Sequence, residues 1–135
     1  MSKVRPSSID SKNKYRIIGD FFDLVSGLNS KKEVIDFFIG LLTPSESLMM
    51  ARRIQIAKML IDEENYEIIR KKLKVSNQTI TKTYNWLYSR GDDYNIWITK
   101  HILKLKDNNK KYKNSKNKSL LDKYPHHRFL KELIS

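Results

Sequence analysis

The chain contains no cysteine, only three prolines and only four glycines among its 135 residues. The absence of cysteine excludes a disulfide scaffold, thiol catalysis and cysteine-rich zinc sites. Long apolar runs are also absent: the longest, with Gly40 counted in it, is Phe37 to Leu42, far short of the ~20 residues of a membrane-spanning helix. The N-terminus lacks the apolar segment of a signal peptide. We therefore expect a soluble, cytoplasmic protein with no membrane partner.

Acidic residues are scarce relative to basic ones. The chain has 15 Asp+Glu against 27 Lys+Arg, which gives a formal net charge of +12 at pH 7. Residues 91–135 carry 11 basic and 5 acidic side chains, so half of the excess lies in the last third. A surface of this sign attracts polyanions, and nucleic acid is the first candidate.

Apolar residues recur at spacings of three and four, which predicts helices, and no segment alternates with period two, so we expect an all-α fold. One such stripe covers residues 15–25 and ends near Gly27. The capping box Ser30-Lys-Lys-Glu33 predicts a second helix start. Thr43-Pro44-Ser45-Glu46 is a stronger start signal, because Thr can cap and Pro loses no needed N–H at the first helical position. It predicts a helix over about 44–61.

The C-terminal third has a different composition from the rest. Residues 107–118 contain one apolar-bodied side chain, Tyr112, and cannot bury enough surface to offset the entropy of ordering. We expect four segments, namely a disordered N-terminus at 1–13, a helical domain at 14–106, a mobile basic linker at 107–118 and a short helical segment at 119–135.

Residues 66–89 have the layout of a helix-turn-helix. Asn65 can cap a short helix over 66–73, and Ser76 can cap the helix that follows the turn. We expect the inward side chains to be Ile69 and Leu73 on the first helix, Val75 in the turn, and Ile80, Thr83, Tyr84 and Leu87 on the second. Lys74 occupies the turn position usually given to glycine, which adopts a positive φ cheaply.

The outer face of the second helix carries amide, hydroxyl and amine groups that suit base edges, because Asn and Gln can bond adenine bidentately and a Thr methyl can meet a thymine methyl. The predicted base-contact residues are Asn77, Gln78, Thr81 and Lys82, with Asn85 one turn later. The preceding helix and turn usually meet phosphate in this motif. The predicted phosphate-contact residues are Arg70, Lys71, Lys72 and Lys74.

Other functions are compatible with the same pattern. Two short amphipathic helices joined by a tight turn occur in many all-α proteins, and a basic helix face is often only solvated. The chain could instead bind nucleic acid without sequence preference through Lys100 to Lys118, or serve as a protein-interaction module. His126 and His127 are adjacent and have no third ligand at metal spacing, so we expect no metal site. No reactive constellation indicates an enzyme or a cofactor.

Three segments together resemble the Trp repressor superfamily, especially its YerC/YecD-like branch. They are Leu41-Leu-Thr-Pro-Ser-Glu46, Ala51-Arg-Arg-Ile-Gln-Ile56 and Lys74-Val-Ser-Asn-Gln-Thr-Ile-Thr81. The resemblance covers about residues 15–90 and implies an intertwined helical homodimer whose two recognition helices enter successive major grooves of double-stranded DNA. The apolar segments 15–27 and 30–42 agree with this, since they carry more apolar surface than one small monomer easily covers.

The resemblance also implies a changed ligand pocket. In the Trp repressor the indole of tryptophan lies between two arginines, and Arg53 matches the first while Thr43 matches a threonine of the same box. With one residue deleted near 62–65, the second arginine becomes Lys82, a glycine becomes Thr83 and a serine becomes Trp86. Lysine lacks the planar guanidinium that stacks on an indole. We expect a vestigial pocket without a tryptophan or other small-molecule ligand, with Trp86 either filling the indole volume or packing as an ordinary core residue.

Overall fold

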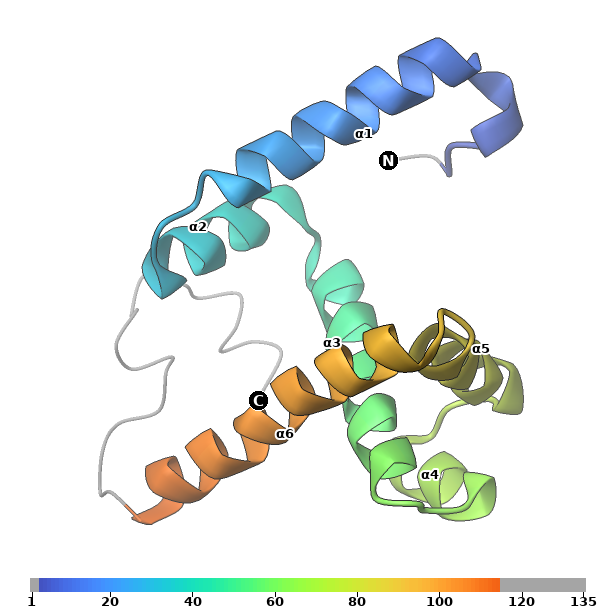
Figure 1. Cartoon of the computed structure of the whole chain (residues 1–135), viewed down its shortest axis with the longest axis vertical. Helices are drawn as coiled ribbons and strands as arrows, with labels where there is room; N and C mark the ends of the chain where they lie inside the picture. The colour runs from blue at the N-terminus through green and yellow to red at the C-terminus, as the bar shows by residue number, and fades with distance from the viewer. Residues whose placement is uncertain (1–2, 115–135) are drawn as a thin grey trace. The chain divides into compact units, whose positions relative to one another are not determined.

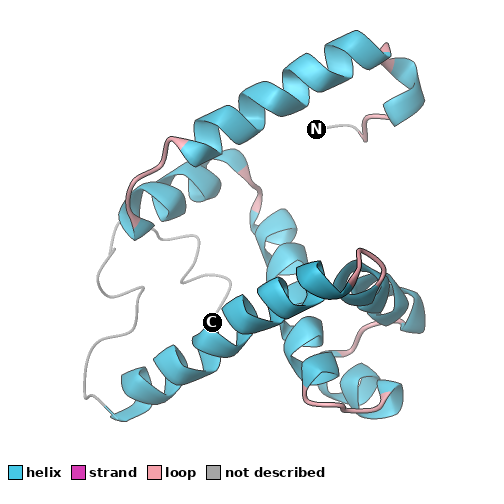
Figure 2. Cartoon of the chain, viewed as in Figure 1, coloured by secondary structure: helices cyan, strands magenta, loops and turns pink. Residues whose placement is uncertain are grey.

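The computed structural model describes residues 3–114, which form helices and their connections (Figure 1). The described part contains no strand (Figure 2), which confirms the all-α prediction there. The helices are the short 3-10 helix η1 (Pro6–Ser8), α1 (Ser11–Ser26), α2 (Lys31–Leu41), α3 (Pro44–Ile61), α4 (Tyr66–Leu73), α5 (Asn77–Tyr88) and α6 (Asp92–Asn114). The chain divides into two compact units, one up to Leu41 and one from Leu42 onward.

The first unit contains η1, α1 and α2, and it begins earlier than the sequence indicated. Residues 1–13 were expected to be disordered, but η1 and the first turn of α1 lie within the described part of that segment. The reason is a local cap that composition does not reveal: the Asp10 carboxylate accepts a hydrogen bond from the Asn13 backbone N–H at 2.9 Å and another from the Asn13 side chain at 2.8 Å.

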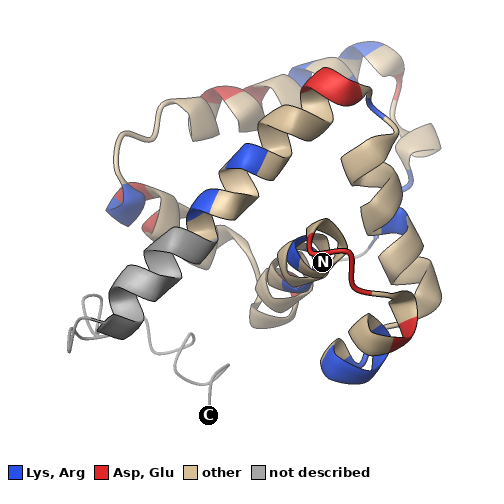
Figure 3. Cartoon of the chain, turned by 60° about the horizontal axis from the view of Figure 1, so that its bottom comes forward, with Lys and Arg blue, Asp and Glu red and all other residues tan. Residues whose placement is uncertain are grey.

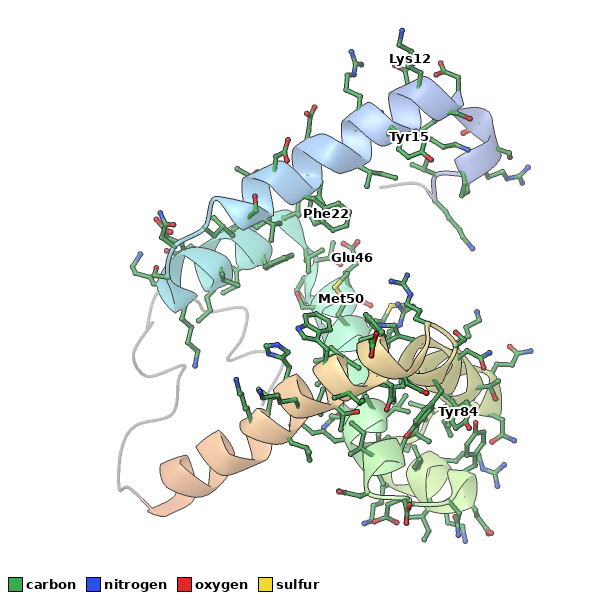
Figure 4. The ribbon with its side chains drawn as sticks, viewed as in Figure 1. Lys12, Tyr15, Phe22, Glu46, Met50 and Tyr84 are labelled. Carbon is green, nitrogen blue, oxygen red and sulfur yellow. The ribbon has the colours of Figure 1, made fainter. Side chains whose placement is uncertain are left out.

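The α1 and α2 helices bury none of their residues. Phe21 and Phe37 lie with ring centroids 6.4 Å apart, yet Phe22 remains 61% exposed and Ile18 52% exposed. Figure 4 shows Tyr15 and Phe22 projecting from one side of α1 and Lys12 from the other. This amphipathic helix therefore presents an apolar side that its own unit leaves open to solvent.

The second unit packs α3, α4, α5 and α6 around one small core. The buried apolar residues are Ile56, Ala57, Leu60, Ile69, Ile80, Leu87 and Ile102. They come from all four helices, with α3 in contact with each of the other three. The central helix α3 runs over the predicted span, and its cap is the predicted capping box: Thr43 Oγ1 accepts from the Glu46 N–H at 3.1 Å, and the Thr43 N–H donates to Glu46 Oε1 at 3.0 Å. The hydrogen bond from the Thr43 backbone lowers the pKa of the Glu46 carboxyl.

The last described helix is longer than expected. A mobile linker was predicted from residue 107, but α6 continues without interruption to Asn114. No glycine or proline follows Gly91 until Pro125, and adding a residue to an existing helix costs far less than starting a new one. The rest of the predicted linker, the C-terminal segment 119–135 and the two adjacent histidines lie outside the described residues.

Candidate nucleic-acid interface

The helix-turn-helix begins and ends at the caps that the sequence indicates. Asn65 Oδ1 accepts from the Ile68 N–H at 2.9 Å and starts α4, and Ser76 Oγ accepts from the Thr79 N–H at 3.2 Å and starts α5. Each cap satisfies one of the N–H groups that a helix start leaves without an internal partner. Both predicted caps are therefore confirmed, and the two helices are separated by only three residues.

The turn contains a left-handed lysine. Lys74 has φ 53° and ψ 50°, and its N–H donates to the Arg70 carbonyl at 2.9 Å. A residue with a Cβ pays about 1–2 kcal/mol to adopt this conformation, which glycine adopts freely. Val75 follows and packs, half-buried, against the core. The sequence observation that Lys74 takes the usual glycine position is thus matched by its backbone geometry.

The inner face of α5 differs from the prediction at one residue. Ile80 and Leu87 are fully buried, and Thr83 is buried with its Oγ1 donating to the Thr79 carbonyl at 3.0 Å. Tyr84 was expected in the same stripe but is 45% exposed, and its ring lies 4.6 Å from that of Tyr88 between centroids. The 100° step of the helix places Tyr84 on the flank of the buried stripe rather than on its centre line.

The outer face of α5 carries the four predicted base-contact residues together. Asn77, Gln78, Thr81 and Lys82 are all exposed, and they jointly line one shallow depression of about 450 Å³. Asn85 is exposed one turn further along the helix. Amide, hydroxyl and ammonium groups therefore share one solvent-facing surface on the N-terminal half of α5.

The predicted phosphate-contact residues surround the end of α4. Arg70, Lys71, Lys72 and Lys74 are all exposed. Lys71 forms a surface ion pair with Glu67 at 3.1 Å, which holds it only weakly because both groups are solvated. Figure 3 shows acidic residues just before α4 and basic residues at its end, the arrangement that the helix dipole favours.

Three of the predicted ligand-pocket residues meet at one pocket. Arg53, Thr83 and Trp86 line a pocket of about 270 Å³, together with Met50 and Ile54. Trp86 packs half-buried against the core and forms one wall of this pocket, while its Nε1 donates to the Tyr94 hydroxyl at 2.7 Å. The indole of Trp86 thus joins α5 to α6.

The other two predicted ligand-pocket residues do not line this pocket. The Thr43 side chain caps α3, and Lys82 lines the depression on α5 and a second pocket. This second pocket, of about 440 Å³, places Arg52 and Arg53 of α3 opposite Lys74 and Lys82. Arg52 was not predicted as a site residue; the adjacent arginines on one helix were the only sequence signal for it.

Among the described residues, no three His, Cys, Asp or Glu side chains cluster in a way that could hold a metal ion. Within residues 3–114, none of the helices combines the length and the apolar character needed to cross a bilayer.

A capped α4, a left-handed turn and an α5 with a polar outer face define a helix-turn-helix of the DNA-binding class. The family model described as "Trp repressor protein" matches residues 18–102, and the chain belongs to this family. It is a family of DNA-binding regulators and not of enzymes. No curated protein and no solved structure matches the chain.

Proposed function

We propose that this member of the Trp repressor family is a homodimeric, sequence-specific transcription regulator of the YerC/YecD-like branch that acts without tryptophan. The observation that carries the proposal is the shared depression of Asn77, Gln78, Thr81 and Lys82 on the exposed face of α5. These side chains offer donors and acceptors that can read base edges in the major groove. The proposed partner is double-stranded DNA, and the proposed location is the cytoplasm.

Cations at the end of α4 and in the turn before α5 support a DNA surface. Arg70, Lys71 and Lys72 end the helix before the turn, and Lys74 lies in the turn itself. Such residues fix the register of a recognition helix by binding phosphates and carry no sequence information. In this proposal α5 reads the bases, and the end of α4 and the turn bind the phosphates.

The apolar side of α1 supports a homodimer. No residue of α1 or α2 is buried, and apolar side chains such as Tyr15, Ile18 and Phe22 are exposed. Exposure of this apolar surface to water is unfavourable. A second copy of the chain would cover it with an identical surface, as two-fold interfaces do. Two recognition helices would then read half-sites about 34 Å apart on the duplex.

Independence from tryptophan is supported by the side chains around the smaller pocket. Thr83 is buried where the family resemblance expects a glycine, and Trp86 is tied to Tyr94 by its indole N–H. Lys82 lines the depression and the larger pocket, and among the described residues Arg53 supplies the one guanidinium that lines the smaller pocket. We expect calorimetric titration with tryptophan to show no binding and the affinity for DNA to be the same with and without it.

Selection of bound duplexes from a random library tests the proposal. It should return a roughly palindromic site, since a two-fold dimer reads both half-sites alike. Recovery of duplexes without a shared sequence would favour the alternative of non-specific binding through the basic tail. Failure to retain any duplex at physiological salt would favour a protein-interaction module.

A further inference from the structure

The larger pocket, between α3 and the helix-turn-helix, brings four basic side chains together. Arg52 and Arg53 approach it from α3, Lys74 from the turn and Lys82 from α5, while Met49 and Val75 supply apolar surface. Among the described residues, no Asp or Glu lines it and none of the four cations forms an ion pair. Arg52 has one neutral partner, Gln55 Oε1, at 3.2 Å from Nη1.

Cations that share one pocket repel one another. An anion that binds between them would offset this repulsion, which favours binding. Two guanidinium groups can each form paired hydrogen bonds to phosphate oxygens, and the lysines add point charges. The hydroxyls of Ser76 and Thr79 also line the pocket and provide neutral donors. The lining therefore matches a multiply charged phosphate better than a single carboxylate.

The backbone at Lys74 is a second and separate observation. Glycine would adopt its left-handed conformation without cost, yet this position carries a lysine whose side chain lines the pocket. Strain of this kind persists where the surrounding structure holds the residue and is a starting point for a functional hypothesis.

We propose that this pocket binds a small phosphorylated anion, one that carries a pyrophosphate or an equally charged group. Its volume of about 440 Å³ falls in the range of small-molecule sites and exceeds what a single phosphate requires. This departs from the sequence-based expectation that no small molecule binds. Because Lys74 and Lys82 also belong to the DNA surface, which rests on the proposed function, the anion competes with DNA and acts as an effector that releases it.

The binding test uses pyrophosphate itself with the full chain, titrated calorimetrically at about 150 mM salt. The pocket variant is Arg52→Gln/Arg53→Gln, which removes two charges and leaves Lys74 and Lys82 in place. The matched control is Lys12→Gln/Arg16→Gln, which removes the same charge from the exposed polar side of α1. We expect saturable binding by the natural sequence, at least about tenfold weaker binding by the pocket variant, and a change of less than about twofold in the control. Lys74→Gly is a second pocket variant, because glycine readily adopts the left-handed conformation of the turn. It should weaken pyrophosphate binding even if the arginine variant folds poorly.

Equal weakening of pyrophosphate binding in the pocket variant and the control would overturn the proposal, because the anion would then be attracted by the net charge of the protein and not by the pocket. Absence of saturable pyrophosphate binding by the natural sequence would also overturn it, and weaker DNA binding by the pocket variant would then assign the pocket to a backbone phosphate of DNA. The competition is read separately as displacement of a labelled duplex by pyrophosphate, which the pocket variant should resist. A chain that binds pyrophosphate in this pocket but binds no DNA would refute the proposed function and leave the anion site standing.

Discussion

Lys74→Gly should make the protein more stable and a weaker DNA binder at the same time. Lys74 is exposed and left-handed, so glycine removes a backbone cost of about 1–2 kcal/mol without creating a cavity. Glycine also increases the conformational entropy of the unfolded chain. This stabilises the unfolded state by about 0.4–1 kcal/mol and offsets part of the gain. The midpoints of these two ranges differ by about 0.8 kcal/mol, which is the expected net gain in the free energy of unfolding.

Urea unfolding at one fixed protein concentration measures this gain. With a slope of roughly 2 kcal/mol per M, the midpoint should rise by about 0.3–0.5 M with the slope unchanged. The matched control is Glu63→Gly, because Glu63 is the other non-glycine residue with a positive φ in the described chain, at 60°. It should stabilise the protein by a similar amount, since the same backbone strain is relieved.

DNA binding separates the two glycine variants. If Lys74 binds one phosphate in each chain of a dimer, its loss should reduce the slope of log affinity against log salt by about 1.8. Glu63→Gly removes no cation and should keep that slope. A destabilised Lys74→Gly would refute the strain argument. A stabilised variant whose affinity and salt slope match those of the natural sequence would show that Lys74 does not bind phosphate.

Light scattering should give about twice the 16.0 kDa chain mass. Phe22→Glu should shift the protein toward monomer, because it places a charge on the apolar side of α1. A natural sequence that is monomeric at micromolar concentration would contradict the dimer. Gln78→Ala should lose about 1–3 kcal/mol for the selected duplex and little for random duplex, whereas Lys72→Ala should weaken both alike. If Gln78→Ala leaves the ratio of the affinities for the selected and the random duplex unchanged, Gln78 does not read a base. The pKa of Glu46 is lowered in the folded state, so its cap contributes stability above its unfolded pKa and loses it as the pH falls through the lower folded pKa. As the pH is lowered from above 4.5, the ordinary pKa of this carboxyl, through the lower folded pKa, the stability of Glu46→Ala should therefore fall less steeply than that of the natural sequence, and parallel pH curves would count against the cap.

Local signals in the sequence determined where α3, α4 and α5 begin. Thr43, Asn65 and Ser76 each bond a backbone N–H three residues later, so the interaction that starts each helix is contained within four residues. The same holds for the polar outer face of α5, because the helix period alone separates it from the buried stripe. The helix-turn-helix could for this reason be placed before any tertiary contact was known.

Tertiary structure decided which side chains from distant segments meet. The larger pocket joins Arg52 and Arg53 to Lys74 and Lys82, which lie more than twenty residues further along the chain. The family resemblance paired Arg53 with Lys82, but no local pattern brings Arg52 and Lys74 to the same pocket, because that depends on how α3 packs against the helix-turn-helix. The helix period places Tyr84 on the flank of the buried stripe of α5, and the packing decided that the core stops short of this flank. Helix starts follow from neighbouring residues, whereas pockets and buried faces follow from the packing of helices that the sequence alone leaves free to cross in several ways.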